Sequence, residues 1–143
     1  MSNQSIIINN FISEWKQAVN DDNHQIIESL FNKEANFYSP IVNTPYKEKT
    51  KFFKLIYFFK SLGEDFKYTQ EYKNDLDMTI CLQFETIIKD PKTNKKMKVE
   101  GVDLFKLNEE GKIIELKVML RPLKSTLIVA SEMKKKLLGK SNL

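Results

Sequence analysis

The sequence is poor in the residues that most often carry metal, redox and nucleophilic chemistry. Its 143 residues include one cysteine, Cys81, and one histidine, His24. A structural zinc ion takes about four nitrogen or sulfur ligands, so these two residues argue against such a site. A lone cysteine forms no internal disulfide, and no nucleophile motif accompanies His24. We therefore expect neither a metal site nor a bound cofactor.

Glycine and arginine are also scarce. The four glycines lack the spacing of a phosphate-binding loop. Arg121 is the only arginine among 23 basic residues, and arginine is the residue that best reads phosphates and base edges. We therefore attribute the net charge of +4 to lysines on the solvated surface and not to a site that binds nucleic acid.

No apolar run is long enough to cross a bilayer, and the N-terminus lacks the pattern of a signal peptide. Together with the single cysteine, these absences favour a cytoplasmic protein that binds neither nucleic acid nor a membrane. The chain length fits one domain over residues 1–143.

Apolar residues recur at helical spacing in several parts of the chain. They predict helices over 5–20, over a short segment ending near Phe31, over 50–62 and over 123–138. Asp22 is the expected N-cap of the second helix, and Gly63 is the expected left-handed end of the third. The closing helix is expected to bury a stripe made of Leu123, Leu127, Ala130, Met133 and Leu137.

The second half of the chain changes to a period of two, which is typical of strands with one buried face. The expected strands cover 35–42, 66–73, 78–88, 97–107 and 112–120. Turn-forming residues at 90–94 and 108–111 predict hairpins, and hence an antiparallel sheet. The order of elements predicts an α+β fold: a curved antiparallel sheet wrapped around the N-terminal helices, with an apolar pocket and a C-terminal helix.

Asp103 is the candidate catalytic residue because it interrupts an otherwise apolar strand. Gly101 precedes it on the same face and is expected to leave room beside it. Loss of water in an apolar pocket raises the pKa of an aspartate, and the protonated acid can donate a hydrogen bond to a carbonyl or enolate oxygen. The alternative is a structural aspartate bonded to a backbone amide or a neighbouring side chain.

Other residues are expected to line the pocket, most of them aromatic or aliphatic. They are Trp15, Tyr38, Ser39, Ile56, Phe59, Tyr72, Phe84, Phe105, Leu116, Val118 and Leu120. Tyr38, Tyr72 or Glu85 would be the partner of Asp103 in a reaction, although strand alternation puts Glu85 on the wetter face. Arg121 is interpreted as one half of an ion pair, with an anchor for an anionic ligand as the alternative.

Several short segments occur in an order that resembles bacterial members of the NTF2-like superfamily, which includes SnoaL-like domains and ketosteroid isomerase. They are 35–42, 45–47, 66–68, 99–105, 111–113 and 118–123. The resemblance implies a cone-shaped α+β barrel with a pocket at its open end. It also implies frequent dimerisation, so a homodimer is expected.

Comparison with ketosteroid isomerase assigns residues one by one. Asp103 matches the carboxylic-acid donor of the oxyanion hole. The general base is replaced by Ser39, and the tyrosine donor of the first helix falls at Trp15. Of the three catalytic residues of ketosteroid isomerase, only the carboxylic-acid donor therefore has an equivalent in this sequence. A serine does not shuttle protons between carbon atoms near neutral pH as a carboxylate does.

Three functions remain open at this point, because the NTF2-like fold hosts many activities. The first is a binding domain for a small apolar or carbonyl-bearing molecule. The second is a cofactor-free isomerase, cyclase or dehydratase with Asp103 as acid or oxyanion donor. The third is a protein-interaction module that uses the outer face of the sheet.

Overall fold

The computed structural model describes residues 2–138. Met1 and residues 139–143, which the single-domain prediction includes, lie outside the described part. The elements in chain order are α1 (Asn3–Asn20), α2 (His24–Ser29), β1 (Phe31–Tyr38), α3 (Lys49–Leu62), β2 (Glu64–Asn74), β3 (Thr79–Lys89), β4 (Lys96–Leu107), β5 (Ile113–Arg121) and α4 (Leu123–Leu138). None of the helices in this part of the chain has the length and apolarity needed to cross a membrane.

The strands form one open sheet in the order β1-β5-β4-β3-β2. Strands β2 to β5 are joined by hairpins and are antiparallel. β1 instead runs parallel to β5, so the sheet is mixed and the prediction of a purely antiparallel sheet is wrong at this edge. No hairpin joins these two strands, so no local turn fixes their relative direction. The predicted α+β class, with its C-terminal helix, is confirmed.

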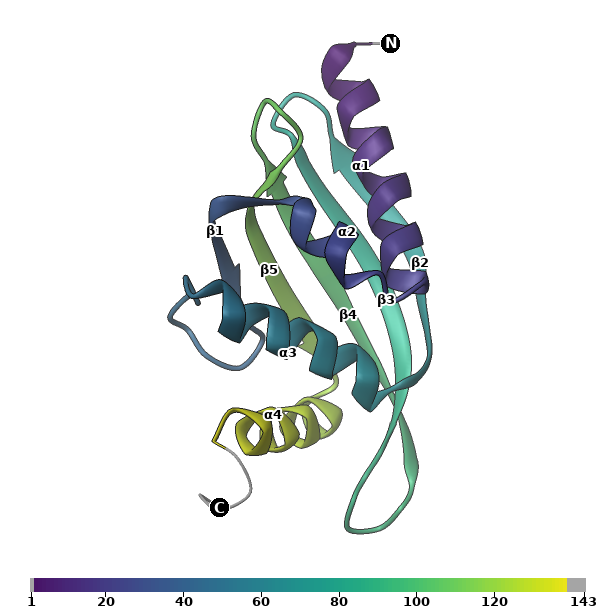
Figure 1. The fold of residues 1–143 in the computed structure, drawn as a ribbon. Coiled ribbons are helices and arrows are strands. Elements are labelled where there is room, and N and C mark those ends of the chain that lie inside the picture. Colours follow the sequence, from purple (N-terminus) through teal and green to yellow (C-terminus); the bar gives the residue numbers. More distant parts are fainter. Residues whose placement is uncertain (1, 139–143) are drawn as a thin grey trace.

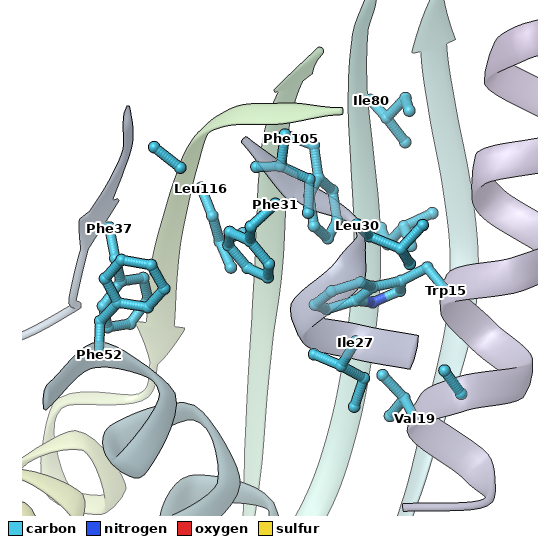
Figure 2. Close-up of a cluster of buried hydrophobic side chains, with 14 of the residues drawn as sticks. Trp15, Val19, Ile27, Leu30, Phe31, Phe37, Phe52, Ile80, Phe105 and Leu116 are labelled. Carbon is cyan, nitrogen blue, oxygen red and sulfur yellow. The ribbon is translucent and has the colours of Figure 1, made fainter. Parts of the chain in front are cut away.

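One face of the sheet carries the first three helices. Figure 1 shows α1, α2 and α3 in front of the strands, and α4 crossing the end of the sheet below α3. The core lies between these layers. Figure 2 shows Trp15 reaching from α1 toward Leu30 and Phe31, with Phe105 of β4 above it in this view. The ring centroids of Trp15 and Phe105 are 4.9 Å apart, which is an edge-to-face contact.

Burial along β3 follows the alternation seen in the sequence. Ile80, Leu82 and Phe84 are buried, whereas Cys81 and Gln83 between them are partly exposed. β4 alternates in the same way. The inward face of these central strands is therefore dry, and any polar side chain on it must find a partner inside the protein.

β1 begins four residues earlier than predicted. α2 ends at Ser29, so Phe31 opens the strand instead of closing the helix. After Tyr38 the chain turns, because the N–H groups of Ile41 and Val42 donate to the hydroxyl oxygen of Ser39. This side-chain turn competes with strand pairing at the end where the sequence had predicted more strand.

At two helix ends the residue or conformation differs from the prediction. Asn23, not Asp22, caps α2, and its side-chain oxygen accepts from the N–H of Ile26. Gly63 follows α3 in an extended conformation rather than a left-handed one. A Cβ atom at Gly63 would lie 2.1 Å from the hydroxyl oxygen of Thr86, so close packing explains this glycine.

α4 has the predicted bounds but presents a different face to the protein. Val129 and Met133 are buried together with Ser125, whose hydroxyl donates to the carbonyl oxygen of Lys98. Leu123 and Leu127, which were expected on the buried stripe, are 73% and 59% exposed. Several apolar stripes coexist on this helix, and its contacts with α3, β4 and β5 select one of them.

A matched pair of substitutions tests this orientation. We expect Val129→Ala to lower the free energy of unfolding by about 2 kcal/mol because it empties a fully buried site. Leu127→Ala should change it by less than about 0.5 kcal/mol because that side chain is exposed. Urea denaturation followed by circular dichroism measures both values. A larger loss for Leu127→Ala would contradict the packing described here.

Candidate functional site

Three side chains from distant segments form a hydrogen-bonded chain on the dry face of the sheet. The Trp15 indole Nε1–H, on α1, donates to the Tyr68 hydroxyl oxygen at 2.9 Å. The Tyr68 hydroxyl, on β2, donates to Asp103 Oδ2, on β4, at 2.6 Å. Asp103 is 8% exposed, so its carboxyl group has left water and found a partner within the protein.

The strand register explains how Tyr68 reaches Asp103. Asp103 pairs with Leu82 on the intervening strand β3, and Phe84, two residues further along β3, pairs with Tyr68. All four side chains therefore point to the same face of the sheet. Tyr68 spans the width of β3, a distance that a long phenol side chain covers.

Burial controls the protonation of both groups. Loss of water raises the pKa of Asp103 to about 7, and the hydrogen bond from Tyr68 opposes part of that rise. Burial, and then the charge of Asp103, raise the pKa of Tyr68 well above its ordinary value. Near neutral pH the tyrosine therefore keeps its proton, while Asp103 is divided between its acid and carboxylate forms.

Asp103 and Tyr68 lie on the wall of a cavity of about 70 Å³. The rest of the lining is mainly apolar and aromatic, and it comes from both the sheet and the helices. Ligand pockets for drug-sized molecules usually measure about 300–1,000 Å³, so a ligand of that size requires the cavity to open. In its present form the cavity accommodates a few water molecules or one small chemical group.

More than half of the residues expected at the pocket line this cavity. Besides Asp103 they are Trp15, Ile56, Phe59, Phe84, Leu116 and Val118. They come from α1, α3 and the inward faces of β3 and β5. Their apolar surface provides the low-dielectric surroundings that raise the pKa of Asp103.

The other residues expected at the pocket lie elsewhere. Phe105 is core, packed on Phe11 and Trp15. Ser39 lines a separate groove next to α4, Tyr38 lies beneath the ammonium group of Lys117, and Tyr72 is 53% exposed. Leu120 contributes to a hollow elsewhere on the sheet. Most of the residues whose position was predicted wrongly lie near the ends of β1 and β2. These two strands form the edges of the sheet, where alternation is a weaker guide to which side chains point inward.

Gly101 does not leave open space beside Asp103. A Cβ atom there would lie 2.5 Å from the ring of Phe84 and 2.6 Å from the carbonyl oxygen of Met119. The Phe84 ring therefore packs directly on the glycine backbone. The space that the glycine leaves is filled by the Phe84 ring, so the prediction of open room beside Asp103 is wrong.

Two further candidates are engaged in ion pairs. Glu85 lies on the opposite face of the sheet from Asp103, between Lys67 and Lys98. It is therefore not placed to act with Asp103. Arg121 bonds Glu100 at 2.8 Å and its side chain is 70% exposed, in agreement with its interpretation as an ion-pair residue.

Sequence reasoning missed the residues at the cavity mouth and did not single out Tyr68. The mouth contains Asp22, His24, Tyr57, Lys60 and Phe66. His24 is exposed, and its ring stacks on Tyr57 with centroids 3.6 Å apart. The alternation of Phe66 and Tyr68 on β2 was a signal for one face, but only the register shows that Tyr68 meets Asp103.

The described part of the chain contains no cluster of side chains suited to bind a metal ion. Within residues 2–138, no group of three or more histidine, cysteine, aspartate or glutamate side chains is arranged to hold a metal ion. The polar side chains of the cavity are instead the carboxyl group of Asp103 and the phenol of Tyr68 on the wall, with Asp22, His24, Tyr57 and Lys60 at the mouth.

No protein-family model and no curated protein matches the sequence. A steroid delta-isomerase from Pseudomonas aeruginosa superposes with a TM-score of 0.77 at 18% identity, over 96% of each chain. An uncharacterized protein with a cystatin-like fold from Silicibacter pomeroyi gives 0.77 at 18% identity, over 92% of this chain and 88% of that one. A putative SnoaL-like polyketide cyclase from Shewanella denitrificans gives 0.64 at 11% identity, over 87% and 98%.

The chain has the NTF2-like fold. At these identities the likeness concerns the fold alone, since the NTF2-like architecture carries unrelated activities. Any activity of this chain therefore depends on the side chains on the inward face of its NTF2-like sheet.

The contact between Tyr68 and Asp103 makes a prediction about protonation. Tyr68→Phe removes a hydrogen bond that lowers the pKa of Asp103, so that pKa should rise above about 7. Tyr72→Phe is the control, because Tyr72 is an exposed tyrosine on the same strand. Carbon-detected NMR titration of the Asp103 carboxyl group measures its pKa in both variants. Equal titration curves for the two variants would show that Tyr68 does not act on Asp103.

Burial of Asp103 also predicts how stability depends on pH. An aspartate in the unfolded chain has a pKa of about 4, whereas Asp103 in the folded protein has a pKa of about 7. The folded state therefore holds one more proton between these values. Its free energy of unfolding should fall as the pH rises from about 4 through about 7.

The total loss relative to Asp103→Asn should be on the order of 4 kcal/mol. The asparagine variant is the reference because it has a similar shape and does not titrate. Urea denaturation of both proteins between pH 4 and pH 8 measures the difference. A difference that stays constant across this range would contradict the raised pKa.

Proposed function

We propose that the protein binds a small apolar molecule that carries a carbonyl group. The observation that supports this proposal is the chain from Trp15 through Tyr68 to Asp103, which ends at the wall of an apolar cavity. In its acid form, Asp103 donates a hydrogen bond to the carbonyl oxygen of the ligand. The surrounding aromatic side chains contact the apolar body.

The hydrogen-bonding capacity of the chain favours this role. The single hydroxyl proton of Tyr68 is donated to Asp103 Oδ2, and the Tyr68 oxygen accepts a hydrogen bond from the indole N–H of Trp15. Within residues 2–138, the side-chain hydrogen bond of Asp103 is made through Oδ2, which leaves the other carboxyl oxygen, Oδ1, for a ligand. A proton on Oδ1 is therefore free for a ligand, and a dry cavity strengthens such a hydrogen bond.

Binding is favoured over catalysis because, within residues 2–138, Asp103 is the only carboxylate on the inner wall of the cavity, and the Tyr68 hydroxyl is already engaged with Asp103 and Trp15. The imidazole of His24 lies at the mouth, where it stacks on Tyr57. Moving a proton between carbon atoms requires a group that accepts it within hydrogen-bond reach. The other described carboxylate at the cavity, Asp22, is at the mouth and is ion-paired with Lys60. Ser39, at the position of the general base in the family comparison, lines a different groove.

A cofactor-free isomerase or cyclase is the second candidate. One observation favours it, namely that the pKa of Asp103 is about 7, where an acid both gives and accepts protons efficiently. Incubation with a β,γ-unsaturated ketone, followed by ultraviolet absorbance of the conjugated product, tests this alternative. Turnover that disappears in Asp103→Asn would replace the binding proposal by the enzymatic one.

The binding proposal predicts a preference for carbonyl compounds over hydrocarbons of equal shape. Cyclopentanone should bind about fivefold more tightly than methylenecyclopentane at pH 6, the value of one net hydrogen bond. The NMR signal of the Trp15 indole N–H reports binding at the cavity, because Trp15 is the only tryptophan.

The preference should vanish as the pH rises through about 7, because the carboxylate form of Asp103 cannot donate. Asp103→Asn is the matched control, since its amide group donates at every pH and should keep the preference at pH 8. Equal affinities at pH 6, or an indole signal that neither compound moves, would overturn the proposal.

A further inference from the structure

A surface groove continues outward from the cavity. The groove has a volume of about 830 Å³ and runs along α3 toward α4. Five residues line both spaces and make up the mouth: Asp22, His24, Tyr57, Lys60 and Phe66. The cavity and the groove are therefore neighbours, and a ligand too long for the cavity can extend into the groove.

A salt bridge lies across this mouth. The ammonium group of Lys60 is 2.9 Å from Asp22 Oδ1, and it also donates to the carbonyl oxygen of Val19 near the end of α1. The side chain of Asp22 is 67% exposed, whereas that of Lys60 is 25% exposed. An exposed carboxylate contributes little to such a pair and exchanges readily with water. Lys60 stays in place, so another anion can take the position of Asp22.

The groove has an excess of positive charge. Besides Lys60 it contains Lys54 and Lys136, neither of which has a carboxylate partner among residues 2–138. The ammonium group of Lys136 lies 5.5 Å from the ring centroid of Phe58, over an apolar surface. The aspartates in the groove are Asp22 and Asp65. The groove thus combines aromatic walls with lysines that are available to an anion.

We propose that the ligand is an apolar molecule that ends in an anion. Its apolar body reaches through the mouth into the cavity, which opens to admit it, and its anionic end lies in the groove, where it replaces Asp22 as the partner of Lys60 and approaches Lys54 and Lys136. This inference rests on the proposed function, because it assigns a ligand class to the same cavity. The requirement for two ends of different chemistry excludes purely apolar compounds as the preferred ligands.

Three probes with the same number of carbon atoms test the two ends separately. Octanoate carries the anion, 1-octanol lacks it, and 2-octanone reports on the cavity alone. Quenching of Trp15 fluorescence measures their dissociation constants. At low ionic strength octanoate should bind about tenfold more tightly than 1-octanol, as expected for a few partly exposed lysines acting together. The preference should shrink as salt is added.

Charge-neutral variants locate the anion. Lys60→Gln should remove most of the preference for octanoate. Because Lys60 also bonds α1, the double variant Lys54→Gln and Lys136→Gln provides a test at two exposed side chains, and it should reduce the preference about threefold. Lys106→Gln is the control, since Lys106 is an exposed lysine of β4 that lines neither the cavity nor the groove.

The outcomes separate this inference from the function beneath it. Binding of 2-octanone with no preference for octanoate over 1-octanol overturns the anionic end and leaves the cavity proposal standing. Failure of all three probes to bind overturns both. An octanoate preference that survives Lys60→Gln and the double variant also overturns the anionic end. Octyl phosphate distinguishes the source of the charge: tighter binding than octanoate supports the lysine site and assigns it to a phosphate monoester.

Discussion

Placing a carboxyl group on the dry face of a sheet requires that three distant segments of the chain meet. Asp103 has left water, and its hydrogen bond comes from Tyr68, which in turn accepts from Trp15. An unsatisfied buried carboxyl group would cost more free energy than one hydrogen bond supplies. The position of α1 over the sheet and the register of β2 on β3 are therefore both coupled to the protonation of one side chain.

Much of the fold could be predicted because hydrophobic periodicity is a local property. Strands β3 to β5 and their hairpins follow from alternation and turn residues, and the bounds of α4 follow from its apolar spacing. Properties that depend on distant contacts could not be predicted. β1 pairs in parallel with a strand some 80 residues away, and α4 buries Val129 rather than Leu127 because of what it packs against.

The residues of the site also fall into those that local sequence signals identify and those that only the folded structure reveals. Asp103 was identifiable because a charged residue stood in an apolar run, which is a signal within a few neighbouring residues. Tyr68 was one of five tyrosines, and only strand register distinguishes it from Tyr72 on the same strand. The mouth combines the turn after α1 with the end of α3, so Asp22 and Lys60 meet only in the folded chain. Asp22 had been assigned to capping, a local role that its neighbour Asn23 fills.

The closing helix determines more than the shape of the C-terminal end. Met133 belongs to α4 and forms part of the cavity wall, while the helix itself rests on α3 and on the ends of β4 and β5. One side of the cavity is thus formed by a helix packed on the sheet rather than by the hydrogen-bonded sheet itself. The shape of the cavity therefore depends on how α4 packs against α3 and the sheet, as well as on the sheet itself.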